Sequence, residues 1–258
     1  TSIGWYRKKF SVNRADSGQR FQLQFDGIYR DANIWVNGFY LGNNKSGYVG
    51  VEYDITDFLH FNRDNYIVVR VDATQYEGWF YEGAGIYRHV WLNIYPKTHI
   101  ATHGVFAHAT IQSDKAKLQI ETTIEKDMPE AGDFSVQVFL NDRSGKRLAQ
   151  SKDQKISIAK NGKAEIHQTL QIEHPRLWSL EDPYLHRIVV ELKRDGKTVD
   201  AQTLKFGFRT FEVKTNGFFL NGKLIKLKGT NNHQDHAGVG SAIPDYLQYY
   251  RISLLKNM

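Results

Sequence analysis

The feature that most limits the fold of this chain is an alternation of apolar and polar residues that recurs up to residue 208. Phe21, Leu23 and Phe25, for example, alternate with glutamines. Because successive side chains of a strand point to opposite faces, a period of two predicts strands with one buried face. Asn37-Gly38 stands between two apolar runs, which predicts a two-residue type I′ hairpin. We therefore expect this region to be mainly β and to form sandwiches.

The aromatic content divides this region near Pro96, because tryptophan and tyrosine are dense before it and sparse after it. We predict one sandwich over residues 1–97 and a second over residues 98–208, which has the length of an immunoglobulin-like domain. Apolar residues at every second position mark a strand of the second sandwich: Phe134, Val136, Val138 and Leu140.

Residues 209–258 follow a different pattern. Asn221-Gly222 predicts another hairpin, and Leu224–Leu227 follows it as an apolar strand. Pro244 and Asp245 then favour the start of a helix. Its apolar residues fall on one face: Leu247, Tyr250, Leu254 and Met258. One strand and one amphipathic helix cannot bury this face alone, so we expect a truncated third domain.

Composition excludes several classes of function. The 34 basic and 28 acidic residues give a net charge of +6 without forming blocks, so we predict no nucleic-acid partner. No apolar run reaches the roughly 18 residues of a membrane helix, so we predict no membrane partner. With no cysteine, the chain has no disulfide, thiolate metal site or cysteine nucleophile. The chain starts at Thr1 without a signal-peptide pattern. A targeting segment outside this chain stays open, and so does the location, with a periplasmic or secreted location favoured over a cytoplasmic one. A homo-oligomer also stays open.

Several segments together resemble glycoside hydrolase family 2. They are Trp5–Phe10, Asp31–Gly38, Glu82–Leu92, Pro175–Trp178 and Phe206–Arg209. The resemblance implies a jelly-roll sugar-binding-like domain over 1–97 and an immunoglobulin-like sandwich over 98–208. Over 209–258 it implies the first strand and helix of a (β/α)8 TIM barrel.

The resemblance also implies a retaining exo-β-glycosidase with a carbohydrate substrate. It is most like β-galactosidase, and β-glucuronidase and β-mannosidase specificity stay open. Retaining hydrolysis uses two carboxyl groups about 5 Å apart, and the family carries them on later barrel strands. We therefore expect no catalytic residue in this chain, and an inactive fragment. We expect no cofactor, although a structural or site metal ion in the full enzyme stays open.

The segment Lys228–His236 resembles the loop after the family's first barrel strand. By this resemblance His233 and Asp235 line the sugar pocket, and Asn231 binds substrate beside them. Gln234 replaces an acidic residue that many relatives have, which leaves the preferred sugar open. Two other interpretations stand beside this one. His233, Asp235 and His236 could ligate a metal ion, or the loop could simply satisfy its own backbone.

An aromatic loop precedes the glycine-rich turn at Gly83 and Gly85. We predict that Trp79 in this loop contacts substrate, with packing at a domain interface as the alternative. The remaining histidines, including His89, His167 and His186, are expected to be structural or solvated. Two rival functions are a free-standing carbohydrate-binding module, which would use exposed aromatics of the first sandwich, and a structural or adhesion sandwich. The unpartnered helix favours the truncated glycosidase.

Overall fold

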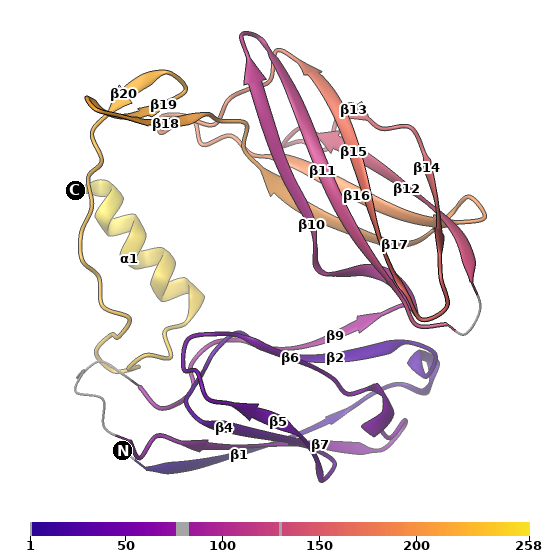
Figure 1. The fold of residues 1–258 in the computed structure, drawn as a ribbon. Coiled ribbons are helices and arrows are strands. Elements are labelled where there is room, and N and C mark those ends of the chain that lie inside the picture. The colour runs from indigo at the N-terminus through magenta and orange to yellow at the C-terminus, as the bar shows by residue number, and fades with distance from the viewer. Residues whose placement is uncertain (1, 76–82, 129–130) are drawn as a thin grey trace. The chain divides into compact units, whose positions relative to one another are not determined.

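The computed structural model describes residues 2–75, 83–128 and 131–258. The chain forms two compact units. The first combines Thr1–Ile94 with Thr230–Met258, and the second is Tyr95–Gly229. Both consist mainly of antiparallel strands, and the described residues contain one α-helix (Figure 1). The prediction of a mainly β chain built from sandwich-like sheets is confirmed.

The first unit contains two main sheets. The four-stranded sheet has the order β1 (Ile3–Ser11), β7 (Asp64–Asp72), β4 (Ala32–Val36), β5 (Phe39–Asn44). The three-stranded sheet has the order β6 (Val51–Asp54), β2 (Arg20–Phe25), β9 (Val90–Tyr95). The short strands β3 (Ile28–Tyr29) and β8 (Gly85–Ile86) pair separately, and two 3-10 helices, η1 (Arg14–Asp16) and η2 (Thr56–Phe58), lie in the connections.

The core of this sandwich consists of the apolar members of the alternating pattern. Phe21, Leu23 and Phe25 are buried while the glutamines between them are partly exposed. Val36 pairs directly with Phe39 across the turn, so the two-residue hairpin is confirmed. Asn37 and Gly38 have φ values of 51° and 87°, the left-handed backbone that a type I′ turn requires.

The second unit also contains two main sheets. One has the order β10 (Thr98–Gln112), β11 (Lys115–Lys126), β15 (Lys163–Glu173). The other has the order β13 (Arg147–Gln150), β12 (Gly132–Asn141), β16 (His186–Arg194), β17 (Lys197–Phe206), with β14 (Gln154–Ile158) also on β12. The predicted core positions Phe134, Val136, Val138 and Leu140 are all buried. The alternation therefore identified the inner face of β12 correctly.

A small antiparallel sheet follows the second sandwich. It consists of β18 (Phe211–Lys214), β19 (Gly217–Leu220) and β20 (Lys223–Ile225). Leu220 pairs with Lys223, so the hairpin at Asn221-Gly222 is confirmed. However, β20 ends at Ile225 and Leu227 is 70% exposed. A barrel strand pairs in parallel, whereas β20 pairs only antiparallel among the described residues, so this structure does not confirm a barrel start.

The predicted helix is present as α1 (Asp245–Asn257). Pro244 is its N-cap, with extended φ and ψ of −62° and 150°, rather than its first helical residue. Proline fits there because its fixed φ suits both positions and it has no N–H group to satisfy. No residue of α1 is buried, and Tyr250 and Leu254 of the predicted apolar face are 50% and 49% exposed. In the part of the chain that the structure describes, no helix has the length and apolarity to cross a membrane.

Candidate functional site

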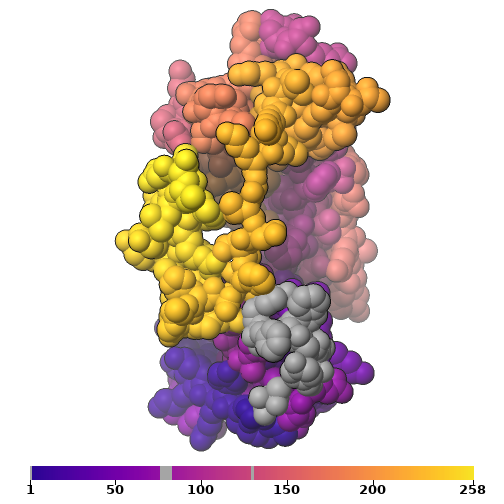
Figure 2. All heavy atoms as spheres, turned by 90° about the vertical axis from the view of Figure 1, so that its left-hand side faces the viewer, coloured from indigo at the N-terminus to yellow at the C-terminus, as the bar shows by residue number. Residues whose placement is uncertain are grey.

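The polar loop, residues 226–244 between β20 and α1, carries three of the four predicted substrate-binding residues. These are Asn231, His233 and Asp235, and all three are exposed. From residue 230 onward the loop belongs to the first unit together with α1. Figure 2 shows this segment in orange and yellow against the indigo and violet strands of that unit. The fourth predicted residue, Trp79, lies outside the described residues.

The polar loop is held by Arg251, which points back to it from the middle of α1. One guanidinium nitrogen donates to the carbonyl oxygen of His233 at 2.9 Å and also to Asn232 Oδ1. The other donates to the carbonyl oxygen of Asp235 at 3.4 Å. A guanidinium offers five donors in a fixed plane, so one side chain can bind several acceptors of an irregular backbone. Sequence reasoning missed Arg251, whose signal was a cation in the middle of the helix, between Asp245 in the first turn and Lys256 in the last.

A tight turn closes the next part of the polar loop. The His236 N–H donates to the Gly240 carbonyl at 3.0 Å, and the Gly240 N–H donates back to the His236 carbonyl at 2.9 Å. Gly238 and Gly240 have φ values of 87° and 59°, a backbone that favours glycine. The loop therefore satisfies part of its own backbone here, and the backbone bonds hold His236 in place.

His89, immediately before β9, lies between two carboxylates. Its Nε2 is 3.3 Å from Asp245 Oδ2 at the start of α1, and its Nδ1 is 3.7 Å from Asp26 Oδ2. Trp91 Nε1 donates to the same Asp26 oxygen at 2.9 Å. The imidazole is half exposed and links the sandwich to the first residue of the helix. This contact joins residues far apart in sequence, and no local spacing signals it.

The glycine-rich turn packs against the polar loop and against β1. A Cβ atom on Gly83 would lie 2.6 Å from Ser241 Oγ, which is too close for any side chain to fit without movement. Gly85 has φ of 99°, and a Cβ atom there would lie 1.9 Å from Tyr6 Oη. A side chain at Gly85 would clash with Tyr6, and one at Gly83 would displace the Ser241 side chain. Together with the His89–Asp245 contact, this turn connects the sandwich to the polar loop and to the start of α1.

Tyr87, which follows the same turn, packs against the sandwich. Its hydroxyl donates to the carbonyl oxygen of Gly47 at 2.9 Å. Burial raises the pKa of the Tyr87 phenol, so the group stays neutral and remains a donor. Gly27 allows this packing, because a Cβ atom there would lie 2.8 Å from the Tyr87 ring.

The metal-ligand interpretation of the polar loop receives no support from the geometry. Among the residues that the structure describes, three metal-ligand side chains converge only at Glu121, Glu165 and His167. These lie on β11 and β15 of the second unit, where His167 Nε2 is 3.2 Å from Glu165 Oε1. His233 and His236 belong to no such cluster.

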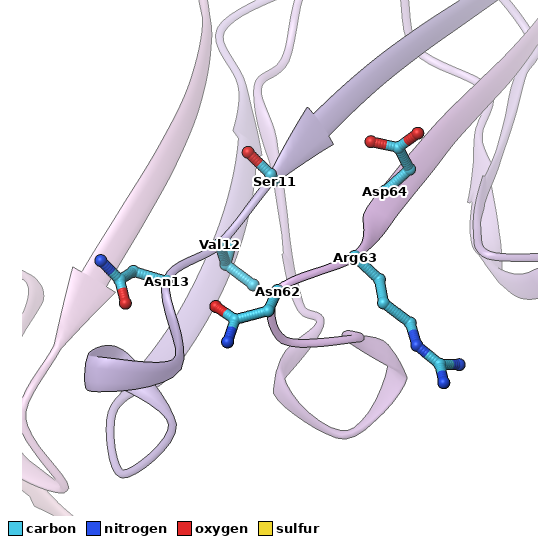
Figure 3. Close-up of a pocket in the computed structure, with 6 residues that line it drawn as sticks. All are labelled: Ser11, Val12, Asn13, Asn62, Arg63 and Asp64. Atoms are coloured by element: carbon cyan, nitrogen blue, oxygen red, sulfur yellow. The ribbon is translucent and has the colours of Figure 1, made fainter.

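A hollow in the first unit also carries polar side chains (Figure 3). It has a volume of about 710 Å³ and is lined by Ser11, Val12, Asn13, Asn62, Arg63 and Asp64. Asn13 Oδ1 accepts from the Ala15 N–H at 3.0 Å, and Asn62 Oδ1 accepts from the Arg14 N–H at 3.1 Å. Arg63 points away from both asparagines in Figure 3. These amide oxygens cap the start of η1, so the hollow reflects local turn structure.

Comparison with known proteins identifies the family. The model described as "Glycosyl hydrolases family 2, sugar binding domain" matches residues 1–96, and "Glycosyl hydrolases family 2" matches residues 98–209. The chain belongs to glycosyl hydrolase family 2. A solved family 2 member from Bacteroides cellulosilyticus is similar with a TM-score of 0.94 and 34% identity, over 99% of this chain and 35% of that one.

Two relatives are named for different activities. A β-galactosidase of Bacteroides ovatus is 33% identical over 260 residues, which cover 99% of this chain and 30% of the relative. A β-glucuronidase of Formosa agariphila is 29% identical, over 97% of this chain and 28% of the relative. The chain thus spans about a third of the length of these relatives.

Proposed function

We propose that this chain is the amino-terminal part of a retaining exo-β-glycosidase and that its polar loop contributes to the sugar pocket. The observation that carries the proposal is the contact between the polar loop, which resembles the active-site edge of the family, and the glycine-rich turn, which resembles the turn at the end of the family's jelly-roll. The glycine-rich turn meets the polar loop at Gly83 and Ser241, and His89 meets Asp245. Both contacts lie within the first unit.

The proposed roles follow from the chemistry of the exposed side chains. His233 and Asp235 would make directed hydrogen bonds to sugar hydroxyls, and Asn231 would add an amide beside them. Such bonds stabilise the transition state when they strengthen as charge develops on the sugar. Trp79 would contact the sugar from the aromatic loop. The catalytic glutamates would come from later strands of a barrel that residues 209–258 begin.

β-Galactosidase activity is proposed first, with β-glucuronidase and β-mannosidase as alternatives. The relatives named above include a β-galactosidase and a β-glucuronidase, and Gln234 departs from the acidic residue that we expect in many relatives. An uncharged amide at this position would not repel a substrate carboxylate, so glucuronate is a strong second substrate class.

The test is hydrolysis of nitrophenyl β-galactoside, β-glucuronide and β-mannoside by a chain extended by about 350 residues to include a complete barrel. His233→Ala and Asp235→Ala should each lower kcat/KM by about 100-fold or more if they bind the transition state. Glu165→Gln, which changes an exposed side chain on β15 of the second unit, serves as the control. Hydrolysis that neither loop variant changes would refute the proposed roles. No hydrolysis of any of the three substrates would refute the proposed activity.

A further inference from the structure

The outer face of the four-stranded sheet carries a row of three aromatic rings, from Trp5 on β1, Trp35 on β4 and Tyr40 on β5. The ring centroids of Trp5 and Trp35 are 6.0 Å apart, with planes 23° from parallel. Those of Trp35 and Tyr40 are 5.4 Å apart. Trp5 is 63% exposed and Tyr40 is 53% exposed. We call these three residues the aromatic platform.

The aromatic platform is not needed to fill the core of the sandwich. Ile34 and Val36, on either side of Trp35, point to the other face of β4 and are fully buried. Trp35 therefore stands on the outer face, where it meets Trp5 from across β7. Soluble proteins rarely expose adjoining large aromatic rings, and such patches mark binding surfaces.

Polar side chains lie in a row beside the rings. Arg70 on β7 pairs with Asn33 on β4, which pairs with Asn43 on β5, so the polar row crosses three strands and ends beside Trp5, the partner of Arg70 on β1. Tyr40 Oη donates to Asn33 Oδ1 at 3.0 Å, which joins the row to the rings. Arg70 also donates to Asp72 at 2.8 Å, which fixes the guanidinium close to the sheet. Amide and guanidinium groups thus border the apolar rings.

We propose that the aromatic platform is a second saccharide-binding site, which holds a glycan chain on the outer face of the sheet. A pyranose ring has one apolar face of C–H bonds and a rim of hydroxyl groups. The C–H face fits against the electron-rich face of an aromatic ring, and the hydroxyl groups bind the amide and guanidinium groups beside it. Three successive rings suit more than one sugar unit, which favours an oligosaccharide or polysaccharide.

The choice of a saccharide over a protein partner has two supports. The aromatic and polar residues of the platform all lie within residues 1–96, the segment matched by the sugar binding domain of the family. The choice also rests on the proposed function, in which the longer protein acts on glycans. The platform shares no residue with the polar loop, so it would retain a glycan without taking part in hydrolysis.

The test is a titration of the 258-residue chain, and of the extended chain, with soluble galactan, galactomannan and xyloglucan, followed by tryptophan fluorescence. We expect saturable binding to at least one of these glycans. Trp5→Ala and Tyr40→Ala should weaken it by about tenfold or more. Phe106→Ala is the matched control, because this ring is 59% exposed on a strand of the second unit. Circular dichroism and thermal unfolding check that each variant folds.

Several results would overturn the inference. One is that the wild type binds none of the glycans, and another is that the platform variants bind as tightly as Phe106→Ala. A third is that the 258-residue chain binds a glycan and the extended chain does not. The last would mean that the rest of the protein covers the platform. If sedimentation velocity shows that the wild type is a dimer and that Trp5→Ala is a monomer, the platform is instead an interface with a second copy of the chain. Hydrolysis is not the readout, so failure here leaves the proposed function standing.

Discussion

Replacing Arg251 with methionine should loosen the polar loop while the helix stays intact. Methionine keeps an unbranched apolar stem of good helix propensity but removes the guanidinium that bonds to Asn232, His233 and Asp235. A hydrogen bond to a charged group contributes about 1.5–3 kcal/mol where it is shielded from water. The polar loop is exposed, so we expect about 1–2 kcal/mol for the three bonds together.

Amide hydrogen exchange of the loop measures this loss directly. The amides of His236, Val239 and Gly240 are hydrogen-bonded inside the loop, so their exchange reports its opening. A loss of 1–2 kcal/mol predicts exchange about 5–30 times faster. Lys256→Met is the matched control, because it removes a cation from the last turn of the same helix. Equal exchange in the two variants would refute the argument and show that the loop is held by its own turn.

Three further predictions concern the stability of the two units. Burial lowers the pKa of His186, which is 2% exposed, so the unfolded chain takes up the proton first as the pH falls. In urea unfolding, the free energy of unfolding of the wild type should fall relative to that of His186→Phe as the pH is lowered below the ordinary histidine pKa of about 6.5. Equal pH dependence of the free energy of unfolding in the two proteins would contradict this. Phe208→Ala removes a fully buried ring and should cost about 3–5 kcal/mol in the same assay, whereas a loss below about 1 kcal/mol would mean that the site collapses. Gly85→Ala should lower the melting temperature more than Gly38→Ala, because both residues have positive φ but only at Gly85 would the new Cβ atom meet another group, Tyr6 Oη.

The strands and hairpins were predictable because local rules specify them. Asn37-Gly38 and Asn221-Gly222 form the expected two-residue turns, since few other residues tolerate two successive left-handed conformations. The alternation also identified the buried face of β12. The end of β20 at Ile225 was not predictable, because a short apolar run beside a hairpin does not reveal which strand pairs with it.

The candidate site was only partly predictable. Resemblance selected His233, Asp235 and Asn231, and their substrate contacts remain predictions, as does the contact of Trp79. The groups that position the loop were missed. Arg251 acts through backbone carbonyl oxygens, which carry no sequence signature, and His89 acts through a carboxylate more than a hundred positions away in the chain. Contacts of this kind depend on tertiary structure, so periodicity and spacing cannot identify them.

The composition of the first unit has a consequence for the order of folding. Its sandwich is made by residues up to Ile94, but residues from Thr230 onward belong to the same unit, and the whole second sandwich lies between them in sequence. Domains fold as units from the amino terminus while the chain is synthesised. Both sandwiches therefore leave the ribosome before the polar loop does. The contacts of Gly83 with Ser241 and of His89 with Asp245 can therefore form only after the intervening second sandwich has been synthesised.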